Sequence, residues 1–245
     1  MTNKEAEWLL QEKYNGVESA EYHADLKRLE AGEPVAYVIG FSKFLGCTID
    51  LSQRTLIPRV ETEYWVEKAI AELPKDMSLT CLDVFSGSGC IGVAVLSKLP
   101  QVTMDFVDIE DSAIEQIQIN TKLNQIDESR YHVYKSDVFA GLPEGNVYDM
   151  IFANPPYIAD KKDVDTSVLE HEPHTALFSP QDGLFHIQKT LEGAQTRLNE
   201  GGVLYLEFDD SQKEMLEMML QNTIFSHKEF YKDQFGRWRW FVARK

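Results

Sequence analysis

The stretch DVFSGSGCIG, residues 83–92, decides the fold of the chain around it. Gly87, Gly89 and Gly92 have the spacing G-x-G-x-x-G, which is typical of a loop that ends a strand and opens a helix. The apolar run LTCLDVF precedes this loop, and the run GCIGVAVLSKL follows it. A buried strand, a glycine loop and a helix in this order predict one unit of a doubly wound α/β sheet, with the loop at the carboxyl end of its strand.

The segments on the C-terminal side of residue 60 alternate between helical and strand patterns. Strands are predicted over 79–85, 102–109, 131–136, 147–153, 201–208 and 236–243. Helices are predicted over 61–73, 89–99, 111–124, 183–198 and 211–221, the first ending before Pro74 and the third capped by Asp111 or Ser112. Such alternation predicts a mostly parallel sheet that is covered by helices on both faces.

The composition before residue 60 differs from that of the rest. Residues 1–33 are charge-rich with scattered apolar positions, which predicts a short N-terminal region of two or three helices. Residues 34–60 are rich in β-branched and aromatic residues with interspersed glycines, which predicts a β-hairpin linker. We therefore divide the chain into 1–33, 34–60 and a doubly wound domain over 61–245.

The charge distribution argues against nucleic-acid binding. The 245-residue chain has a formal net charge of -16, whereas proteins that hold a phosphate backbone usually carry a basic surface. Basic residues are concentrated only in the last twenty positions, and Arg237 and Arg239 there alternate with apolar residues. We interpret GRWRWFVA as a half-buried antiparallel strand at a sheet edge, with solvated arginines, and expect no stable nucleic-acid binding.

The cysteines and the N-terminus indicate a cytoplasmic protein. Cys47, Cys81 and Cys90 form no C-x-x-C pair, and their odd number fits a reducing compartment. No apolar run approaches the length of a membrane span, and the first ten residues carry acids where a signal peptide needs a basic flank. We therefore expect no membrane partner.

The glycine loop alone leaves two ligands open. Its glycine spacing is that of dinucleotide-binding loops, but Asp83 also makes it D-x-x-x-G-x-G, the loop of an S-adenosylmethionine site. Asp108 ends the next predicted strand, where a carboxylate can accept both ribose hydroxyls of either ligand. These residues predict an adenosine-containing ligand without identifying it.

The segment FANPPYI, residues 152–158, decides between the two ligands. Pro155 and Pro156 lack backbone donors and fix their own φ angles, so the loop is rigid and its carbonyls can accept hydrogen bonds. Asn154 adds a side-chain carbonyl and Tyr157 a flat aromatic face. Together they predict a pocket that accepts both hydrogens of a planar NH2 group and stacks on its π-system, which suits transfer of a methyl group to nitrogen.

These two motifs resemble those of the class I methyltransferases that modify planar nitrogens. Within that class, LIPRVETE at residues 56–63 is similar to the I-P-R-P-E-T-E signature of the HemK-type family, which methylates the glutamine of the Gly-Gly-Gln motif in class I release factors. The segments GEPVAYVIGFSKFLG and EPHTALFSPQDGL also resemble that family, so the similarity runs from about residue 32 to the C-terminus. The resemblance implies a seven-stranded sheet, the cofactor S-adenosylmethionine and a class I release factor as partner.

The resemblance also implies two sets of site residues. The cofactor-binding set is Phe85, Ser86, Gly87, Ser88, Gly89, Asp108, Asp137, Val138 and Asn154. The catalytic set is Asn154, Pro155, Pro156 and Tyr157. In this assignment the loop 85–89 wraps the methionine part of the donor, Asp108 holds the ribose, residues 137–138 border the adenine, and Asn154 contacts both donor and substrate.

Three residues depart from the family's pattern. Phe85 stands where the family usually has glycine, which predicts a different shape at the start of the loop. Val138 replaces a common aromatic residue beside the adenine, which predicts weaker stacking, and Val60 replaces the proline of the signature. The helical region before Gly32 is also shorter than the family's usual N-terminal domain, which helps to recognise the release factor.

Other functions are weighed against this one. A ribosomal-protein glutamine methyltransferase and an amino-methyltransferase for adenine N6 or guanine N2 of nucleic acids would use the same loop, and a non-catalytic binder would keep only the cavity. His171 and His174 lack a third ligand cluster, so we predict no metal site. Glu61 and Glu63 are interpreted as ordinary stabilisers of a helix start.

Overall fold

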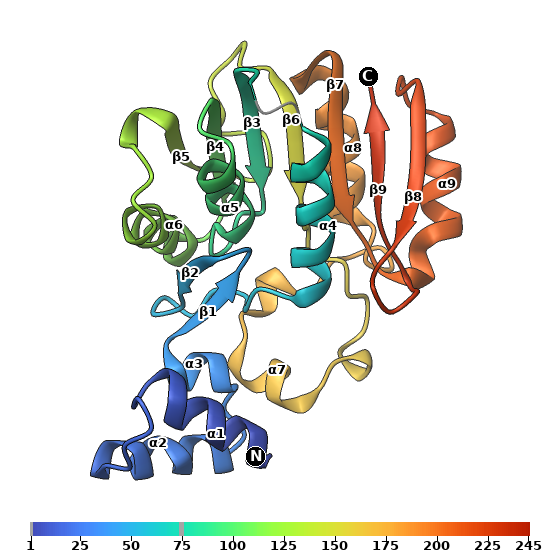
Figure 1. Cartoon of the computed structure of the whole chain (residues 1–245). Helices are drawn as coiled ribbons and strands as arrows, with labels where there is room; N and C mark the ends of the chain where they lie inside the picture. Colours follow the sequence, from blue (N-terminus) through green and yellow to red (C-terminus); the bar gives the residue numbers. More distant parts are fainter. Residues whose placement is uncertain (1, 74–75) are drawn as a thin grey trace.

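Seven mostly apolar segments form the central sheet, which Figure 1 shows in the upper half of the molecule. The structure is a computed structural model and describes residues 2–73 and 76–245. The strands are β3 (Leu79–Val84), β4 (Val102–Asp108), β5 (Tyr131–Lys135), β6 (Tyr148–Ala153), β7 (Leu198–Glu207), β8 (His227–Lys232) and β9 (Trp238–Arg244). Their order is β5-β4-β3-β6-β7-β9-β8, with parallel pairing from β5 to β7. The predicted doubly wound, mostly parallel seven-stranded sheet is confirmed.

Strand order reverses at β3. The chain continues from β3 to β4 on one side of it and later returns to β6 on the other. The loops that follow β3 and β6 therefore leave the same edge of the sheet in opposite directions, which opens a crevice for a ligand. In Figure 1 these strands point downward to that edge, above the small hairpin.

The C-terminal strand β9 lies inside the sheet. It pairs antiparallel with both β7 and β8, so the predicted direction is confirmed, but the predicted edge position is wrong because β8 is the edge strand. The prediction of solvated arginines is also wrong for Arg239, which is 8% exposed. Its guanidinium donates to the carbonyl oxygen of Phe208 at 3.2 Å and lies 3.5 Å from the Asp233 carboxylate. An arginine in the sheet interior requires such partners because water does not reach it.

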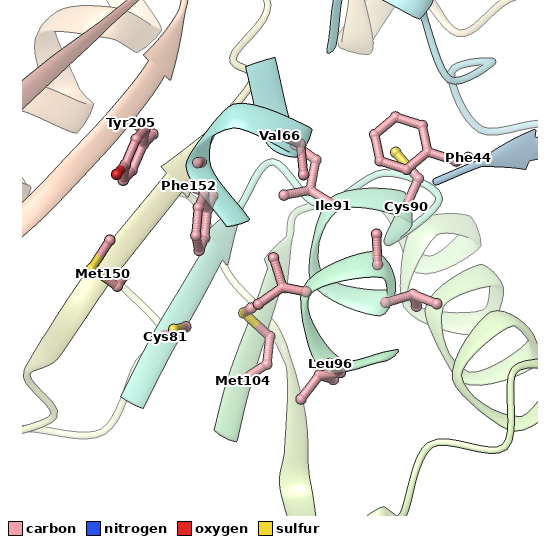
Figure 2. Packing of buried hydrophobic residues seen from close by; sticks show 14 of the residues in the cluster. Phe44, Val66, Cys81, Cys90, Ile91, Leu96, Met104, Met150, Phe152 and Tyr205 are labelled. Atoms are coloured by element: carbon pink, nitrogen blue, oxygen red, sulfur yellow. The ribbon is translucent and has the colours of Figure 1, made fainter. Parts of the chain in front are cut away.

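Helices cover both faces of the sheet. They are α4 (Val60–Glu72), α5 (Cys90–Lys98), α6 (Asp111–Leu123), α8 (Phe185–Arg197) and α9 (Lys213–Gln221). Helices α4, α5 and α6 lie on one face, and α8 and α9 on the other. Figure 2 shows Val66 of α4 and Ile91 of α5 in the core that also contains Met104 and Phe152 of the sheet. Helix α4 ends at Glu72, and the predicted stop at Pro74 lies outside the described residues.

A small helical region and a hairpin precede the sheet. Their elements are α1 (Asn3–Glu12), α2 (Ala20–Glu30), α3 (Val35–Ile39), β1 (Phe41–Phe44) and β2 (Cys47–Asp50). The predicted hairpin is confirmed over 41–50 only, because α3 occupies the start of the 34–60 segment. The backbone N–H of Asp50 donates to the side-chain oxygen of Asn120 on α6, and that of Thr48 donates to Asn124, the C-cap of the same helix. These bonds fix the hairpin against α6. The division at 1–33, 34–60 and 61–245 stays a prediction.

Short helices complete the connections. They are α7 (Thr166–His171) and the 3-10 helices Glu128–Arg130, Lys161–Asp163, His174–Ala176 and Asp210–Gln212. The three cysteines are buried free thiols. Across residues 2–73 and 76–245, no helix combines the length and apolar character that crossing a membrane would require.

Candidate active site

One cavity at the carboxyl edge of the sheet is lined by the loops that follow β3, β4, β5 and β6. It brings together eight residues of the predicted cofactor-binding set: Phe85, Ser86, Gly87, Ser88, Asp108, Asp137, Val138 and Asn154. Gly89, the remaining member, is instead the N-cap of α5 with a φ of 75°. A Cβ on Gly89 would lie 3.1 Å from the side chain of Ile117, so this glycine serves close packing of the loop against α6.

The Asp108 carboxylate is fixed at the wall of this cavity. Its Oδ2 accepts the backbone N–H of Gly87 at 2.8 Å, and its Oδ1 accepts that of Glu110 at 3.0 Å. Burial raises the pKa of Asp108, whereas these two hydrogen bonds oppose the rise. Each carboxylate oxygen keeps a lone pair for a ligand hydroxyl. The predicted caps of the following helix are wrong, because Glu110 is the N-cap of α6 and makes no side-chain cap bond.

A second carboxyl group, that of Asp83, lies fully buried behind the glycine loop. Its Oδ2 accepts the backbone N–H of Gly92 at 3.0 Å, which connects the end of β3 to the first turn of α5. Burial raises the pKa of Asp83 to about 7, and the nearby Asp108 adds to this rise. Gly92 has no room for a side chain, since a Cβ there would lie 2.2 Å from the Phe106 ring. The motif residues that do not line the cavity thus hold strand and helix together.

Two departures from the family's pattern share one backbone feature. Phe85 and Val138 both adopt the left-handed region, with φ angles of 60° and 54°, where side chains with a Cβ are strained. The start of the glycine loop therefore has a backbone that glycine would adopt readily. The Phe85 ring packs edge-on against His186, with 5.7 Å between ring centroids, and both residues line the cavity. Burial lowers the pKa of His186, which favours its neutral form.

The Asn-Pro-Pro-Tyr loop separates this cavity from a second one. Asn154 lines both cavities, Pro156 lines the first, and Pro155 and Tyr157 line the second. The other residues of the second cavity are Leu56, Arg59, Ile158, Val164, Asp165, Val168, Ala176 and Leu177. All four residues predicted as catalytic therefore lie between two adjoining cavities.

The segment LIPRVETE contributes a wall to both cavities and is fixed by an ion pair between a half-buried arginine and a buried carboxylate. Arg59 lines both, and its guanidinium lies 2.6 Å from the carboxylate of Glu172. The other oxygen of Glu172 accepts the backbone N–H of Ile57 at 3.0 Å. Glu172 is the first residue of EPHTALFSPQDGL, so one buried carboxylate joins two family-like segments that are distant in the sequence.

Three side chains that the sequence analysis did not select hold the Asn-Pro-Pro-Tyr loop. Asn154 Nδ2 donates to Thr62 Oγ1 at 3.2 Å, and the Tyr157 hydroxyl donates to Glu207 Oε1 at 3.1 Å. Thr62 and Trp65 in turn donate to Glu207 Oε2. Glu207 could have been found from the sequence. It is an acid at the end of the apolar run GGVLYLE, and the carboxyl ends of parallel strands form the edge of the sheet where ligands bind.

The remaining candidates have structural roles. The rings of His171 and His174 face the backbone carbonyls of Ser167 and Leu169. Within the described parts of the chain, no group of three or more metal-ligating side chains is found. Glu63 accepts the backbone N–H of Leu45 at 2.6 Å, so this carboxylate connects α4 to the hairpin rather than only stabilising the helix start.

Comparisons with known proteins agree with this geometry. A family model described as Methyltransferase small domain matches residues 68–176. The chain is 35% identical to the release factor glutamine methyltransferase of Coxiella burnetii, over 91% of this chain and 79% of that protein. It is 33% identical to the enzyme of the same name from Streptococcus pneumoniae, over 96% of this chain and 83% of that protein. The solved T. thermophilus 16S rRNA N2 G1207 methyltransferase, in complex with AdoMet and guanosine, has the same fold, with a TM-score of 0.58 at 17% identity over 84% of this chain and 49% of that one.

The residues of the first cavity fit S-adenosylmethionine. Asp108 offers a fixed carboxylate of the kind that accepts ribose hydroxyls, and Gly87 leaves room for a ligand to approach the backbone. Asn154 lies on the wall shared by this cavity and a second one, which Pro155 and Tyr157 also line. The fold, the cofactor cavity and two relatives above 30% identity along most of their length together show that this chain belongs to the family of release factor glutamine methyltransferases, which depend on S-adenosylmethionine.

Proposed function

We propose that this protein methylates the side-chain nitrogen N5 of the glutamine in the Gly-Gly-Gln motif of a class I peptide chain release factor. The observation that carries the proposal is the position of Asn154 on the wall shared by two cavities. One cavity has the features of a donor site, and the other offers Arg59, Tyr157 and apolar side chains to a substrate loop. The names of the relatives support the choice of release factor as the substrate.

The residues of the first cavity hold the donor in this proposal. S-adenosylmethionine, when bound, would supply an electrophilic methyl group on a sulfonium sulfur; the sulfur would keep the electron pair of the broken C–S bond, and the methylated nitrogen would release one proton to water. Asp108 accepts the ribose hydroxyls, and residues 85–88 surround the methionine part with backbone that includes Gly87. Asp137 and Val138 border the adenine, although the Asp137 carboxylate also binds Lys189 at 2.9 Å. Together these residues would hold the donor in the cavity that Asn154 also lines.

The residues of the second cavity prepare the nucleophile. An amide nitrogen is a weak nucleophile because its lone pair is delocalised into the carbonyl. Asn154 Oδ1 and the carbonyl of Pro155 accept the two hydrogens of the glutamine NH2 group, which raises electron density on nitrogen and directs it at the methyl group. Asn154 is a neutral carboxamide, so it positions the substrate and does not act as a strong base. Tyr157 supplies the face against which the planar amide packs.

The test is methyl transfer to a purified class I release factor. The enzyme is incubated with labelled S-adenosylmethionine and the release factor, and the Gly-Gly-Gln peptide is analysed by mass spectrometry. We expect one methyl group on the glutamine side chain, and none when that glutamine is replaced by glutamate. An unmodified Gly-Gly-Gln peptide, or label in ribosomal proteins, DNA or ribosomal RNA supplied in parallel, would contradict the proposed substrate.

The cellular setting of the reaction is also a proposal. The three cysteines are free and buried, which fits the reducing cytoplasm where release factors act on ribosomes. We expect no stable nucleic-acid complex, because the chain has a net charge of -16. Cell fractionation and a gel-shift assay with ribosomal RNA measure these two points.

A further inference from the structure

A buried carboxylate outside both cavities connects the two ends of the Asn-Pro-Pro-Tyr loop. Glu207, at the end of β7, is 1% exposed. Its Oε2 accepts the Thr62 hydroxyl at 2.6 Å and the Trp65 indole N–H at 2.7 Å, and its Oε1 accepts the Tyr157 hydroxyl at 3.1 Å. Burying a carboxylate is unfavourable unless it is fully hydrogen-bonded, and three side chains donate here to a carboxyl group that lines neither cavity.

The chemistry of these groups fixes the direction of every hydrogen bond. Burial raises the pKa of Glu207, whereas the hydrogen bonds from Thr62 and Trp65 oppose the rise and favour the ionised form. An indole N–H only donates, so Glu207 Oε2, which lies 2.7 Å from the Trp65 nitrogen, is an acceptor. Thr62 Oγ1, at 2.6 Å from that oxygen, must direct its own proton to it, because two oxygen lone pairs would repel at this distance. The lone pairs of Thr62 Oγ1 then face Asn154, 3.2 Å away, and can only be satisfied by the amide NH2 group. Asn154 is thus oriented with Nδ2 toward Thr62 and Oδ1 free to face the cavities.

We propose that Glu207 is a positioning residue, which acts through Thr62 to hold the Asn154 amide in the orientation that presents its oxygen to the substrate. The inference rests on the proposed methylation of a glutamine amide. The substrate nitrogen carries two hydrogens and needs acceptors. A flipped Asn154 would place its own NH2 group against the substrate NH2 group, so two donors would face each other and no hydrogen bond would form. Because an asparagine amide is nearly symmetric in shape, packing alone selects weakly between the two orientations, and a hydrogen bond of fixed direction has to select.

The second oxygen of Glu207 extends the same control to the other end of the loop. Tyr157 donates to it, and Arg239 NH1 lies 3.5 Å from the Tyr157 oxygen as a donor. The bonds again run in one direction, from a donor-only guanidinium to an acceptor-only carboxylate. Trp65 and Arg239 are the donor-only groups of this network, and the single carboxylate orients both Asn154 and Tyr157.

A pair of substitutions at Thr62 tests the connection. Thr62→Val keeps the shape but removes the hydroxyl, so the Asn154 amide is free to rotate, and we expect kcat to fall about 10- to 100-fold with an unchanged dissociation constant for S-adenosylmethionine. Thr62→Ser keeps the hydroxyl and recovers most of the lost kcat. Thr121→Val is the matched control: it removes the hydroxyl of a buried threonine on a different helix, α6, and should leave kcat unchanged. Equal kcat values for the valine and serine variants at Thr62 would overturn the proposal.

Substitutions at Glu207 test the direction of the bonds. In Glu207→Gln the new side-chain amide can place either its oxygen or its NH2 group beside Thr62 and Trp65. The Trp65 N–H needs an acceptor, so it selects the oxygen, Thr62 still donates to that oxygen, and the Asn154 orientation is retained. In Glu207→Leu the Thr62 proton has no acceptor there and turns to Asn154 Oδ1, which favours the flipped amide. We expect kcat to fall about 10- to 100-fold for leucine and less than tenfold for glutamine. A leucine variant that folds and retains the kcat of the glutamine variant would overturn the proposal; if it does not fold, the Thr62 pair decides.

A readout without substrate separates this inference from the proposed function. In the 15N-labelled protein, one proton of the Asn154 side-chain NH2 group is expected to exchange slowly with solvent, and its signal is identified by its loss in Asn154→Ala. The slow exchange persists in Thr62→Ser and disappears in Thr62→Val. Fast exchange of both protons in the unsubstituted protein overturns the inference. A wild-type enzyme that shows the slow proton but leaves the Gly-Gly-Gln glutamine unmodified overturns the proposed function alone.

Discussion

The two loops that meet at the site are held in different ways. In the glycine loop, the backbone N–H groups of Ser86 and Gly87 bond to Val107 and Asp108 on the adjacent strand, and left-handed residues set its turns. The Asn-Pro-Pro-Tyr loop is held by side chains from α4 and β7, which lie 92 positions before Asn154 and 50 positions after Tyr157. The first loop is thus shaped by its own backbone and its neighbouring strand, and the second by distant side chains. Substitutions in the glycine loop should therefore lower the affinity for the methyl donor and the stability of the fold. Substitutions that affect the Asn-Pro-Pro-Tyr loop should instead lower kcat.

The largest expected effect is on the rate. Asn154→Ala removes an acceptor for the substrate amide, and we expect kcat to fall about 10²- to 10³-fold, the usual effect of removing one preorganised polar group from a site. The dissociation constant for S-adenosylmethionine, measured by calorimetry, should change little. Asn199→Ala, a half-buried asparagine at the start of β7, is the control and should leave both values unchanged. Equal losses in rate and donor affinity would show that Asn154 belongs functionally to the first loop.

The second prediction concerns the free energy of unfolding and its dependence on Asp83, which lies behind the glycine loop. The pKa of Asp83 is about 7 in the folded protein, above its ordinary value of 3.8, so the folded state binds this proton more tightly than the unfolded state. Its contribution favours folding fully below about pH 4 and is lost as pH rises through 7. Urea unfolding across pH 4.5–8 should show a decrease of a few kcal/mol from this group, since one pKa unit corresponds to about 1.4 kcal/mol. Asp83→Asn should flatten the profile, whereas an equal slope in both proteins would contradict the prediction.

The same difference explains what the sequence could and could not predict. The glycine loop, Asp108 and the parallel sheet follow from short-range spacing and hydrophobic period, and all are found where expected. Thr62 and Glu207 act across the fold, so their link to Asn154 becomes visible only when α4 and β7 are placed beside β6. The misplaced edge strand has a similar cause. Alternation in residues 236–243 predicts a strand, but no local pattern tells whether β8 or β9 is outermost.

The third prediction complements that for Asn154. Asp108→Ala removes the acceptor for the ribose and leaves the backbone N–H of Gly87 without its partner. We expect donor affinity to fall about 10- to 100-fold, which corresponds to the loss of one or two hydrogen bonds to a charged group. At saturating donor, kcat should fall less than the affinity does. Asp111→Ala, an exposed carboxylate three positions later, is the control. A lower kcat with unchanged donor affinity would remove the distinction between the two loops.

The smallest effect tests whether the glycine loop stores backbone strain. At an ordinary position, alanine is more stable than glycine by about 0.5–1 kcal/mol, because glycine is more flexible in the unfolded chain. Phe85 has a φ of 60°, where a Cβ is unfavourable by about 1–2 kcal/mol and glycine is not. Both Phe85→Ala and Phe85→Gly lose the contact of the ring with His186, so that loss cancels in their comparison.

We therefore expect the ordinary ranking to be reversed at this position. Phe85→Gly should be more stable than Phe85→Ala by up to about 1 kcal/mol in urea unfolding. The same pair at Phe139 should show alanine as the more stable variant, because this half-buried residue also packs its ring against the core but does not have a positive φ. If alanine is also the more stable variant at Phe85, the left-handed backbone there carries no strain. The glycine loop would then depend on surrounding side chains as the Asn-Pro-Pro-Tyr loop does, because its own backbone preference could not account for its shape.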